Sequence, residues 1–425
     1  MKTPVILTVA ALGCVAGATD LVGHAAAHPD GRAAYAFEHG AYRKDLAGLP
    51  IGVFDSGIGG LTVLEALLSL DVFHNDTLQP GGDGRPDFAD ERFQYFGDQA
   101  NMPYGNYSSA GRTGYLRELI LKDAVFLLGR RWFDPGTKTF RHDKPPVKAL
   151  VIACNTATAY GIEDIRAALK AWNLPVFVVG VVEAGARGVQ AVHREGAVGV
   201  LATVGTCASG AYPKAIGQTL GLAGRAVPVV TQQGSANLAG VIEGDPSFQE
   251  TVAERCRLDV RALVEAHRQS GVTAPLSTLV LGCTHFPLVQ PDIDAVFQSL
   301  LREPGLAELI APRMEYVNPA EWTARELFRE LARAGLRGGT GSRQKDRFYL
   351  SIPNPLRSDL PLTPDGGLEK DFKYSRLPGE LGREDTVNVP MTPERIPETT
   401  RKLIESRLPL VWGRLKSEAR NSKSE

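Results

Sequence analysis

The feature that most constrains this chain is a sequence pattern that occurs twice. Residues 51–60 read IGVFDSGIGG and residues 198–207 read VGVLATVGTC, so in both an apolar run enters a glycine-rich turn with hydroxyl side chains. Each segment has a later companion: residues 150–159 read LVIACNTATA, and residues 279–288 read LVLGCTHFPL. In these companions an apolar run leads to a small residue, a cysteine and polar side chains. The repeat predicts two similar lobes, and in each lobe a cysteine directly follows a strand.

Short apolar runs alternate with segments of helical periodicity along most of the chain, which is typical of parallel sheets covered by helices. The predicted strands are 50–54, 93–96, 149–153, 176–181, 198–201, 226–230 and 278–281. The main predicted helices are 62–70, 112–130, 161–172, 183–194 and 248–270. We therefore expect an α/β fold of two pseudo-symmetric parallel-sheet domains, with the active site in the cleft between them, where open α/β sheets bind ligands.

The repeat also sets the expected domain boundaries. The first domain takes residues 49–181 together with 286–338, and the second takes 182–285. Two insertions in the first domain, 74–91 and 132–146, are rich in Gly, Pro and charge and are expected to be surface loops that add nothing to the core.

The C-terminal extension, residues 339–425, differs in composition from the rest. Eight prolines fall between Pro353 and Pro397, among charges and glycines, which argues against a compact sheet there. One terminal amphipathic helix, from about 394 to 415, is expected to dock on the body.

The N-terminus, MKTPVILTVAALGCVAGATD, has one early lysine, then an uncharged and largely apolar stretch, then small residues. This pattern is typical of a secretory signal peptide and is too short for an ordinary membrane span. Residues 1–27 are expected to be a signal peptide or a disordered N-terminus. No other stretch is apolar enough to cross a bilayer.

Composition removes several classes of function. A formal net charge of −1 gives no electrostatic case for nucleic acid or an anionic membrane. The five cysteines include no CxxC pair and no Cys/His ligand spacing, so we expect no metal site, and their odd number argues against a disulfide framework. They are Cys14, Cys154, Cys207, Cys256 and Cys283.

Cys154 and Cys283 are the candidates for chemistry. A single cysteine at a strand end is typical of a small buried core residue. When a cysteine stands at the start of a helix, however, the free backbone amides there favour the thiolate form of its side chain. Two such cysteines facing each other across a substrate could act as reciprocal acid and base, one removing a proton while the other supplies one from the opposite face. That arrangement inverts a stereocentre without a cofactor.

Five ordered motifs covering more than half of the chain resemble glutamate racemases, within the aspartate/glutamate racemase superfamily. They read IGVFDSGIGGLTVL, YFGDQANMPYG, VIACNTATA, VGVLATVGTCASGAY and LVLGCTHFPL. The resemblance implies two α/β domains, no cofactor, and two cysteines that act on opposite faces of glutamate. Cys154 would take the α-proton of D-glutamate, and Cys283 that of L-glutamate.

The resemblance also assigns the surrounding residues. Asp55 would tune or relay protons beside Cys154, Ser56 would contact the α-substituents, and His285 would handle protons beside Cys283. Glu243, in VIEGD, is the expected catalytic-shell glutamate, although the segment before it is longer than the family pattern. The remaining expected substrate contacts hold the amino and carboxylate groups: Asn155, Thr156 and Thr284 at the α-carbon, and Pro103, Tyr104, Gly105 and Thr206 at the side-chain carboxylate.

The resemblance predicts an enzyme that supplies D-glutamate for peptidoglycan and so for cell wall biogenesis and cell shape. Two alternatives stay open: a racemase of another acidic amino acid such as aspartate, and a non-catalytic exported amino-acid-binding protein. The expected partner is the small-molecule substrate, and a homodimer is a further expectation. The N-terminus points to the periplasm, whereas the family role points to the cytoplasm.

Overall fold

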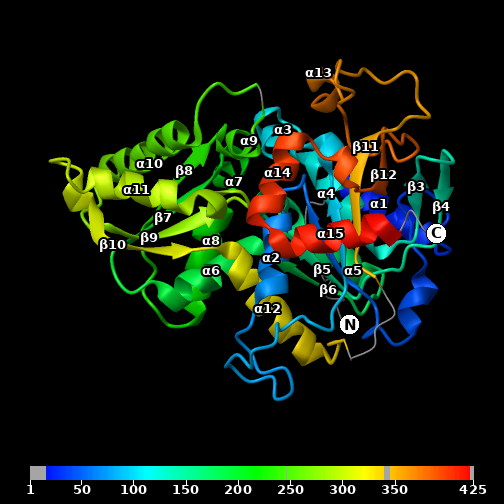
Figure 1. Cartoon of the computed structure of the whole chain (residues 1–425), viewed down its shortest axis with the longest axis horizontal. Coiled ribbons are helices and arrows are strands. Elements are labelled where there is room, and N and C mark those ends of the chain that lie inside the picture. The colour runs from blue at the N-terminus through cyan, green and yellow to red at the C-terminus, as the bar shows by residue number, and fades with distance from the viewer. Residues whose placement is uncertain (1–15, 246, 339–344, 422–425) are drawn as a thin grey trace, which may run out of the picture.

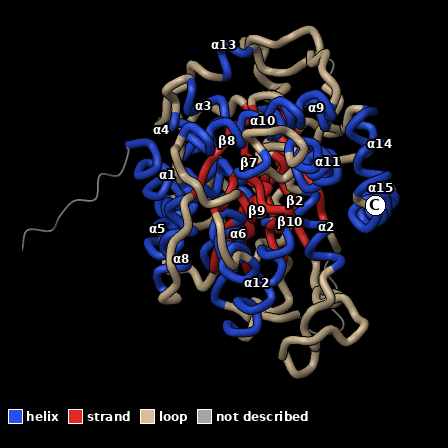
Figure 2. The backbone as a smooth tube through the Cα atoms, turned by 90° about the vertical axis from the view of Figure 1, so that its left-hand side faces the viewer, coloured by secondary structure: helices blue, strands red, loops and turns tan. Residues whose placement is uncertain are grey.

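The computed structural model describes residues 16–245, 247–338 and 345–421. They form two α/β lobes side by side, one built on a six-stranded sheet and the other on a four-stranded sheet (Figure 1). Helices lie on both sides of the strands (Figure 2). The expected α/β class with parallel sheets is therefore confirmed.

The sheet of the first lobe has the order β12-β11-β2-β1-β5-β6, and its neighbouring strands run parallel except for the antiparallel pair β11 and β12. The strands are β1 (Ile51–Asp55), β2 (Phe93–Gly97), β5 (Ala149–Ile152), β6 (Phe177–Gly180), β11 (Arg347–Pro353) and β12 (Thr386–Pro390).

Alternate residues of these strands enter two separate cores, because successive side chains point to opposite faces of a sheet. Val53 and Val151 face the helices on one side, and Phe54 and Ile152 face those on the other. The first face is covered by α2 (Leu61–Ser69), α12 (Pro319–Ala334), α14 (Glu398–Arg407) and α15 (Pro409–Asn421). The second is covered by α1 (Ala16–Ala27), α3 (Gly105–Ser109), α4 (Thr113–Leu128) and α5 (Asn155–Ala171).

The sheet of the second lobe has the order β10-β9-β7-β8, all parallel. Its strands are β7 (Ala197–Thr203), β8 (Val230–Ser235), β9 (Leu276–Gly282) and β10 (Ile310–Val317). The helices of this lobe are α6 (Val181–Val192), α7 (Val204–Ala208), α8 (Ala211–Leu222), α9 (Leu238–Glu243), α10 (Val252–Gln269) and α11 (Gln290–Leu300). Short 3-10 helices occur at His39–Arg43, Gln99–Asn101, Phe286–Val289, Ala307–Leu309 and Pro393–Arg395.

The repeated motifs occupy equivalent places in the two sheets. β1 lies beside β5 with Phe54 opposite Ile152, and β7 lies beside β9 with Ala202 opposite Gly282. Each glycine-rich turn is thus next to the turn that carries a cysteine, at the carboxyl ends of two neighbouring parallel strands. Ligands of open α/β sheets bind at this edge.

Three sequence-based boundaries are corrected. β10 pairs with β9, so part of the segment 286–338 belongs to the second sheet and not to the first domain. β8 spans Val230–Ser235 instead of 226–230. Its sequence VTQQGS is mostly polar, and such a sequence is tolerated because β8 is an edge strand. The helix expected at 161–172 begins already at Asn155, because the Cys154 sulfur caps it.

Both insertions contribute to the core, contrary to expectation. In 74–91, Phe88 is buried against Phe93 and Phe328. In 132–146, the strands β3 (Trp132–Asp134) and β4 (Thr139–Arg141) form a small antiparallel hairpin that buries Phe133. Large aromatic side chains thus anchor segments whose overall composition resembles surface loops.

Residues 16–27 are helical, so the expectation of a disordered N-terminus is wrong for them. Leu21 and Ala25 of α1 are buried against the first lobe, and the Trp172 indole nitrogen donates a 3.0 Å hydrogen bond to the Val22 carbonyl. Residues 1–15, which carry most of the signal-like pattern, lie outside the described residues, and export stays a prediction. Among the described helices, none is long and apolar enough to cross a membrane.

The C-terminal extension contains sheet, which the proline content had argued against. β11 pairs in parallel with β2, and β12 pairs antiparallel with β11. Pro353 and Pro390 each stand at a strand end, where a missing N–H is tolerated. Instead of one terminal helix there are two, α14 and α15, preceded by the short helix α13 (Lys370–Lys373). α15 packs on α2, so the extension belongs to the first lobe.

Candidate active site

The two candidate cysteines occupy equivalent buried positions, one at the edge of each sheet. Cys154 follows β5 and caps α5, where its sulfur accepts a 3.4 Å hydrogen bond from the Ala157 amide. Cys283 follows β9 at the matching place of the second lobe. The repeat therefore delivers one thiol from each lobe to the side where the two lobes meet.

Asp55 and Ser56 stand beside Cys154. The Ser56 amide donates to Asp55 Oδ1 at 2.7 Å, and the Cys154 thiol lies 3.7 Å from Ser56 Oγ. Burial raises the pKa of the Asp55 carboxyl, an effect that the charge of nearby His285 partly offsets. Burial and the Asp55 charge raise the pKa of Cys154 well above its usual value. The Cys154 sulfur is thus held as a thiol that can donate a proton.

Cys283 has a different set of neighbours. Its sulfur lies 3.7 Å from His285 Nδ1, and His285 Nε2 lies 2.6 Å from Glu243 Oε1. Burial opposes protonation of His285, but the hydrogen bonds to Cys283 and Glu243 raise its pKa well above its usual value. A protonated His285 places a positive charge next to the Cys283 sulfur. The structure thus brings Glu243 to the site despite the divergent segment before it.

The two thiol environments touch each other across the lobes. Thr284 Oγ1 lies 3.4 Å from Asp55 Oδ2 and 3.5 Å from His285 Nδ1, and Thr62 Oγ1 donates to the Thr284 carbonyl at 2.9 Å. A line of polar side chains therefore runs from one cysteine to the other, through Ser56, Asp55, Thr284 and His285. The arrangement can take up a proton at one sulfur and supply one from the other.

Close approach of the lobes at Gly59 leads to a testable prediction. A methyl group at this position would lie 2.6 Å from Thr284 Oγ1 and would collide with the His285 ring. Because misplacing catalytic groups by about 1 Å can cost about a hundredfold in rate, we expect Gly59→Ala to lower kcat/KM at least about tenfold. The midpoint of thermal unfolding should change little.

The control for Gly59→Ala is Gly221→Ala on α8, where an added methyl group meets nothing within 4 Å. Steady-state kinetics of this control should match the wild type. Full activity in Gly59→Ala would mean that the close contact between Gly59 and His285 is not needed for turnover.

Hydroxyl and amide groups line the second side of the site. Thr156 Oγ1 lies 3.0 Å from Thr206 Oγ1 and 3.2 Å from Thr203 Oγ1, so three hydroxyls from both lobes bond to one another. The Tyr212 hydroxyl donates to Asn155 Oδ1 at 2.6 Å, again across the lobes. Such groups can exchange these bonds for bonds to the polar ends of an amino acid.

Thr203 and Tyr212 were missed by the sequence reasoning. A signal for Thr203 existed, because the repeat aligns it with Ser56. Tyr212 had one as well, because it ends the motif VGVLATVGTCASGAY, but its contact with Asn155 depends on how α8 packs.

The turn around Pro103 lies at the meeting point of the lobes. A Cβ on Gly57 would lie 2.5 Å from Met102 Sδ, and one on Gly205 would lie 2.7 Å from the Gly105 Cα. The Tyr104 side chain, however, points into the first lobe. Its hydroxyl bonds to Asp98 Oδ2 at 2.5 Å and to Asp123 Oδ2 at 2.7 Å.

These two bonds commit the one proton of the Tyr104 hydroxyl to acceptors of the first lobe. Burial and the Asp98 charge raise the pKa of Asp123 well above its usual value, so a proton is shared within this buried cluster. Any contact of residues 103–105 with a substrate therefore falls to their main chain.

In the part of the chain that the structure describes, no three His, Cys, Asp or Glu side chains are grouped so that they could hold a metal ion. The polar groups gathered at the lobe interface are suited to proton transfer and to binding a small zwitterion.

Known proteins are similar to this chain in sequence and in architecture. The family described as Asp/Glu/Hydantoin racemase matches residues 137–307. A glutamate racemase from Geobacter metallireducens is 35% identical over 285 residues, which are 67% of this chain and 80% of that protein. A glutamate racemase from Neisseria meningitidis is 34% identical over 310 residues, covering 73% of this chain and 90% of the relative. Among solved structures, a glutamate racemase isoform from Bacillus anthracis superposes with a TM-score of 0.51 at 27% identity, covering 71% of this chain and 87% of that one.

Proposed function

Because the chain belongs to the glutamate racemase family and is an amino-acid racemase, we propose that it interconverts L-glutamate and D-glutamate by proton transfer between two cysteines. The observation that carries the proposal is the placement of Cys154 and Cys283 at equivalent strand ends of the two lobes, joined by a line of polar side chains. A mechanism that works from two opposite faces needs one group from each side.

In the direction from L- to D-glutamate, the Cys283 thiolate removes the α-proton and becomes a thiol. The electron pair left on the α-carbon is delocalised into the carboxylate, and the Cys154 thiol then supplies a proton from the opposite face and becomes a thiolate. One proton is taken and one is given, so no net oxidant, reductant or cofactor is consumed. The reverse direction exchanges the roles of the two sulfurs.

The remaining site residues would hold the substrate during this transfer. Ser56 and Asn155 are next to Cys154, and Thr284 is next to Cys283; these three side chains would bind the α-amino and α-carboxylate groups. Thr206 and the main chain of residues 103–105 would bind the side-chain carboxylate. The D-glutamate formed would supply peptidoglycan synthesis.

The proposal is tested by incubating the protein in deuterated water with a panel of amino acids and following deuterium at the α-carbon by NMR. Both enantiomers of glutamate should exchange and racemise, and aspartate should react at least about tenfold more slowly, because one methylene in a fitted site is worth about 10- to 200-fold. Exchange with aspartate alone would overturn the choice of substrate. Binding of an amino acid without any exchange would favour the non-catalytic binding protein.

A further inference from the structure

The C-terminal extension contacts the segment 98–107, which contains the turn proposed to receive the side-chain carboxylate of the substrate. The Lys373 ammonium donates to the Met102 carbonyl at 2.8 Å, and the Tyr374 hydroxyl donates to the Pro103 carbonyl at 3.4 Å. Two successive carbonyls that lead into the turn are therefore held by two successive residues of the extension. Main-chain contacts of this kind fix where a loop lies, whatever its side chains are.

A second pair of contacts holds the start of the same segment. Ser351 of β11 donates to Asp98 Oδ1 at 2.7 Å and accepts a hydrogen bond from the Ala100 amide at 2.9 Å. Asp98 in turn accepts from the Tyr104 hydroxyl. The position of the turn is thus linked to a strand that the extension adds to the sheet.

Arg376 completes the set of contacts. Its guanidinium donates to the side-chain oxygen of Asn101 and to the Tyr107 hydroxyl, the latter at 3.3 Å. The Tyr374 ring packs against the ring of Tyr107 with 4.8 Å between centroids. Extension residues therefore contact both ends and the middle of 98–107.

The opposite side of this segment meets the candidate active site. Met102 lies against Gly57, next to the Asp55–Ser56 pair, and Gly105 lies against Gly205 of the second lobe. The extension residues named above meet the substrate site through this segment. Helix α14 of the extension also lies beside α9, where Thr399 is next to Gly244 and so one residue from Glu243.

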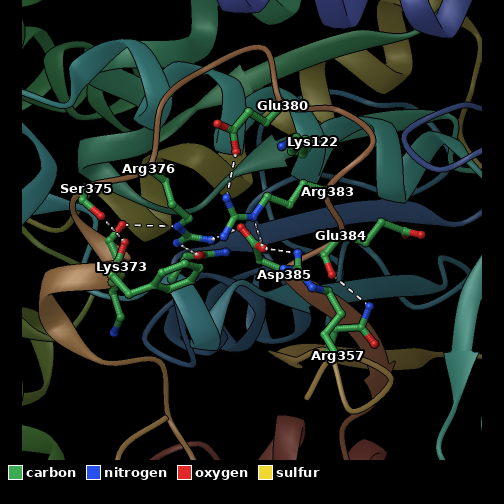
Figure 3. A network of polar contacts seen from close by, with 12 residues as sticks. Lys122, Arg357, Lys373, Ser375, Arg376, Glu380, Arg383, Glu384 and Asp385 are labelled. Carbon is green, nitrogen blue, oxygen red and sulfur yellow. Dashed lines mark hydrogen bonds and ion pairs between the residues drawn. The ribbon is translucent and has the colours of Figure 1, made fainter. Parts of the chain in front are cut away.

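Ion pairs and hydrogen bonds within the extension hold together the part that makes these contacts (Figure 3). The buried Asp385 carboxylate accepts from Arg357 Nη1 at 2.7 Å and from Arg383 Nε at 3.0 Å, and it lies 3.6 Å from Arg376 Nη1. Three arginines from three parts of the extension converge on one carboxylate. Such a network holds Arg376 in place more firmly than a single exposed ion pair would.

We propose that Ser351, Lys373, Tyr374 and Arg376 are positioning residues that set how far the side-chain carboxylate site lies from the two thiols, and that they thereby select glutamate over the shorter aspartate. The inference rests on the proposed glutamate racemase function and deepens it. Glutamate exceeds aspartate by one methylene, so a turn that is free to shift by about that length loses discrimination.

The test compares Lys373→Met with the matched control Lys370→Met, which removes an exposed lysine from the same short helix, α13. The side-chain carboxylate takes no part in the proton transfer, so we expect the loss of its alignment to raise KM and to leave kcat nearly unchanged. For Lys373→Met we expect a KM for glutamate about tenfold higher, as for the loss of one charge-assisted hydrogen bond, with kcat within about twofold. The ratio of kcat/KM for glutamate to that for aspartate should fall at least about threefold.

Three further measurements make this outcome specific. Lys373→Arg should restore KM, because arginine can donate to the same carbonyl, and Tyr374→Phe should reproduce the change in a weaker form. The midpoint of thermal unfolding should stay near that of the wild type in all four variants, since Lys373 and Tyr374 are only partly buried. A KM and a glutamate-to-aspartate ratio that match Lys370→Met would overturn the inference. Inactivity of the wild type toward glutamate would instead overturn the proposed function.

Discussion

Cys154→Ala and Cys283→Ala are each expected to lower kcat for racemisation of glutamate by at least about a thousandfold, because each removes one of two groups that must act in every turnover. Both cysteines are buried at strand ends, and the loss of one sulfur should leave the fold intact. The measurement is the change in optical rotation or circular dichroism of pure L- or D-glutamate with time. Cys256→Ala is the matched control, because this buried thiol of α10 lies in the core of the second lobe.

The racemisation assay alone does not tell which cysteine removes the α-proton of which enantiomer. The two enantiomers have equal free energy in water, so kcat/KM must be the same in both directions for every variant. Deuterium incorporation without inversion separates the roles. Cys283→Ala should exchange the α-proton of D-glutamate only, and Cys154→Ala that of L-glutamate only. Racemisation by either variant at more than about a tenth of the wild-type rate would contradict the two-cysteine mechanism.

Glu243→Gln is expected to lower kcat/KM by about a hundredfold at neutral pH, the size of a lost acid–base contribution. In the wild type, burial lowers the pKa of His285, but the hydrogen bonds to Cys283 and Glu243 outweigh it and hold this pKa above its usual value, so the imidazolium persists to a higher pH than that of a free histidine. Without the Glu243 charge the pKa of His285 falls, and the positive charge beside the Cys283 sulfur is lost at a lower pH. The alkaline limb of the kcat/KM profile should therefore move to lower pH, with partial recovery of activity as the pH is lowered.

The pH profile of Glu265→Gln gives the reference for this shift. Glu265 lies on α10 of the same lobe and pairs with Arg268 at the surface, so its removal changes the charge of the protein equally. Its profile should match that of the wild type. If Glu243→Gln also keeps the wild-type profile, Glu243 plays no part in holding the charge of His285.

The duplicated motifs made the two lobes and the positions of both cysteines predictable, because a strand followed by a glycine-rich turn or by a cysteine has few structural solutions. The repeat even contained Thr203, aligned with Ser56, although its role was not read from it. The direction of Tyr104 was beyond the sequence, because it depends on Asp98 and Asp123, which approach from other elements. The contact of His285 with Glu243 likewise depends on how α9 packs, and no spacing rule reports that packing.

The sequence-based prediction that the extension contains no sheet was wrong for a physical reason. Prolines in number argue against interior strands, and eight of them stand between Pro353 and Pro397. In the structure, Pro353 and Pro390 fall at the strand ends, where they remove no needed hydrogen bond. The segment RFYLSIP that forms β11 carried a strand signal of aromatic and branched side chains, which the surrounding composition outweighed.

Pairing of β11 with β2 also protects an edge of the first sheet that could otherwise pair with another copy of the chain. Without residues 345–421, β2 would be the edge of the first sheet, and its sequence FQYFG has neither a charge nor a proline to block pairing with another chain. Exposed edges of this kind are templates for aggregation. The extension transfers the edge to β12, a strand of five residues that ends in proline and lies beside the β3–β4 hairpin. Removal of residues 345–421 would thus replace the short edge strand β12, which ends in proline, with the uncharged edge strand β2.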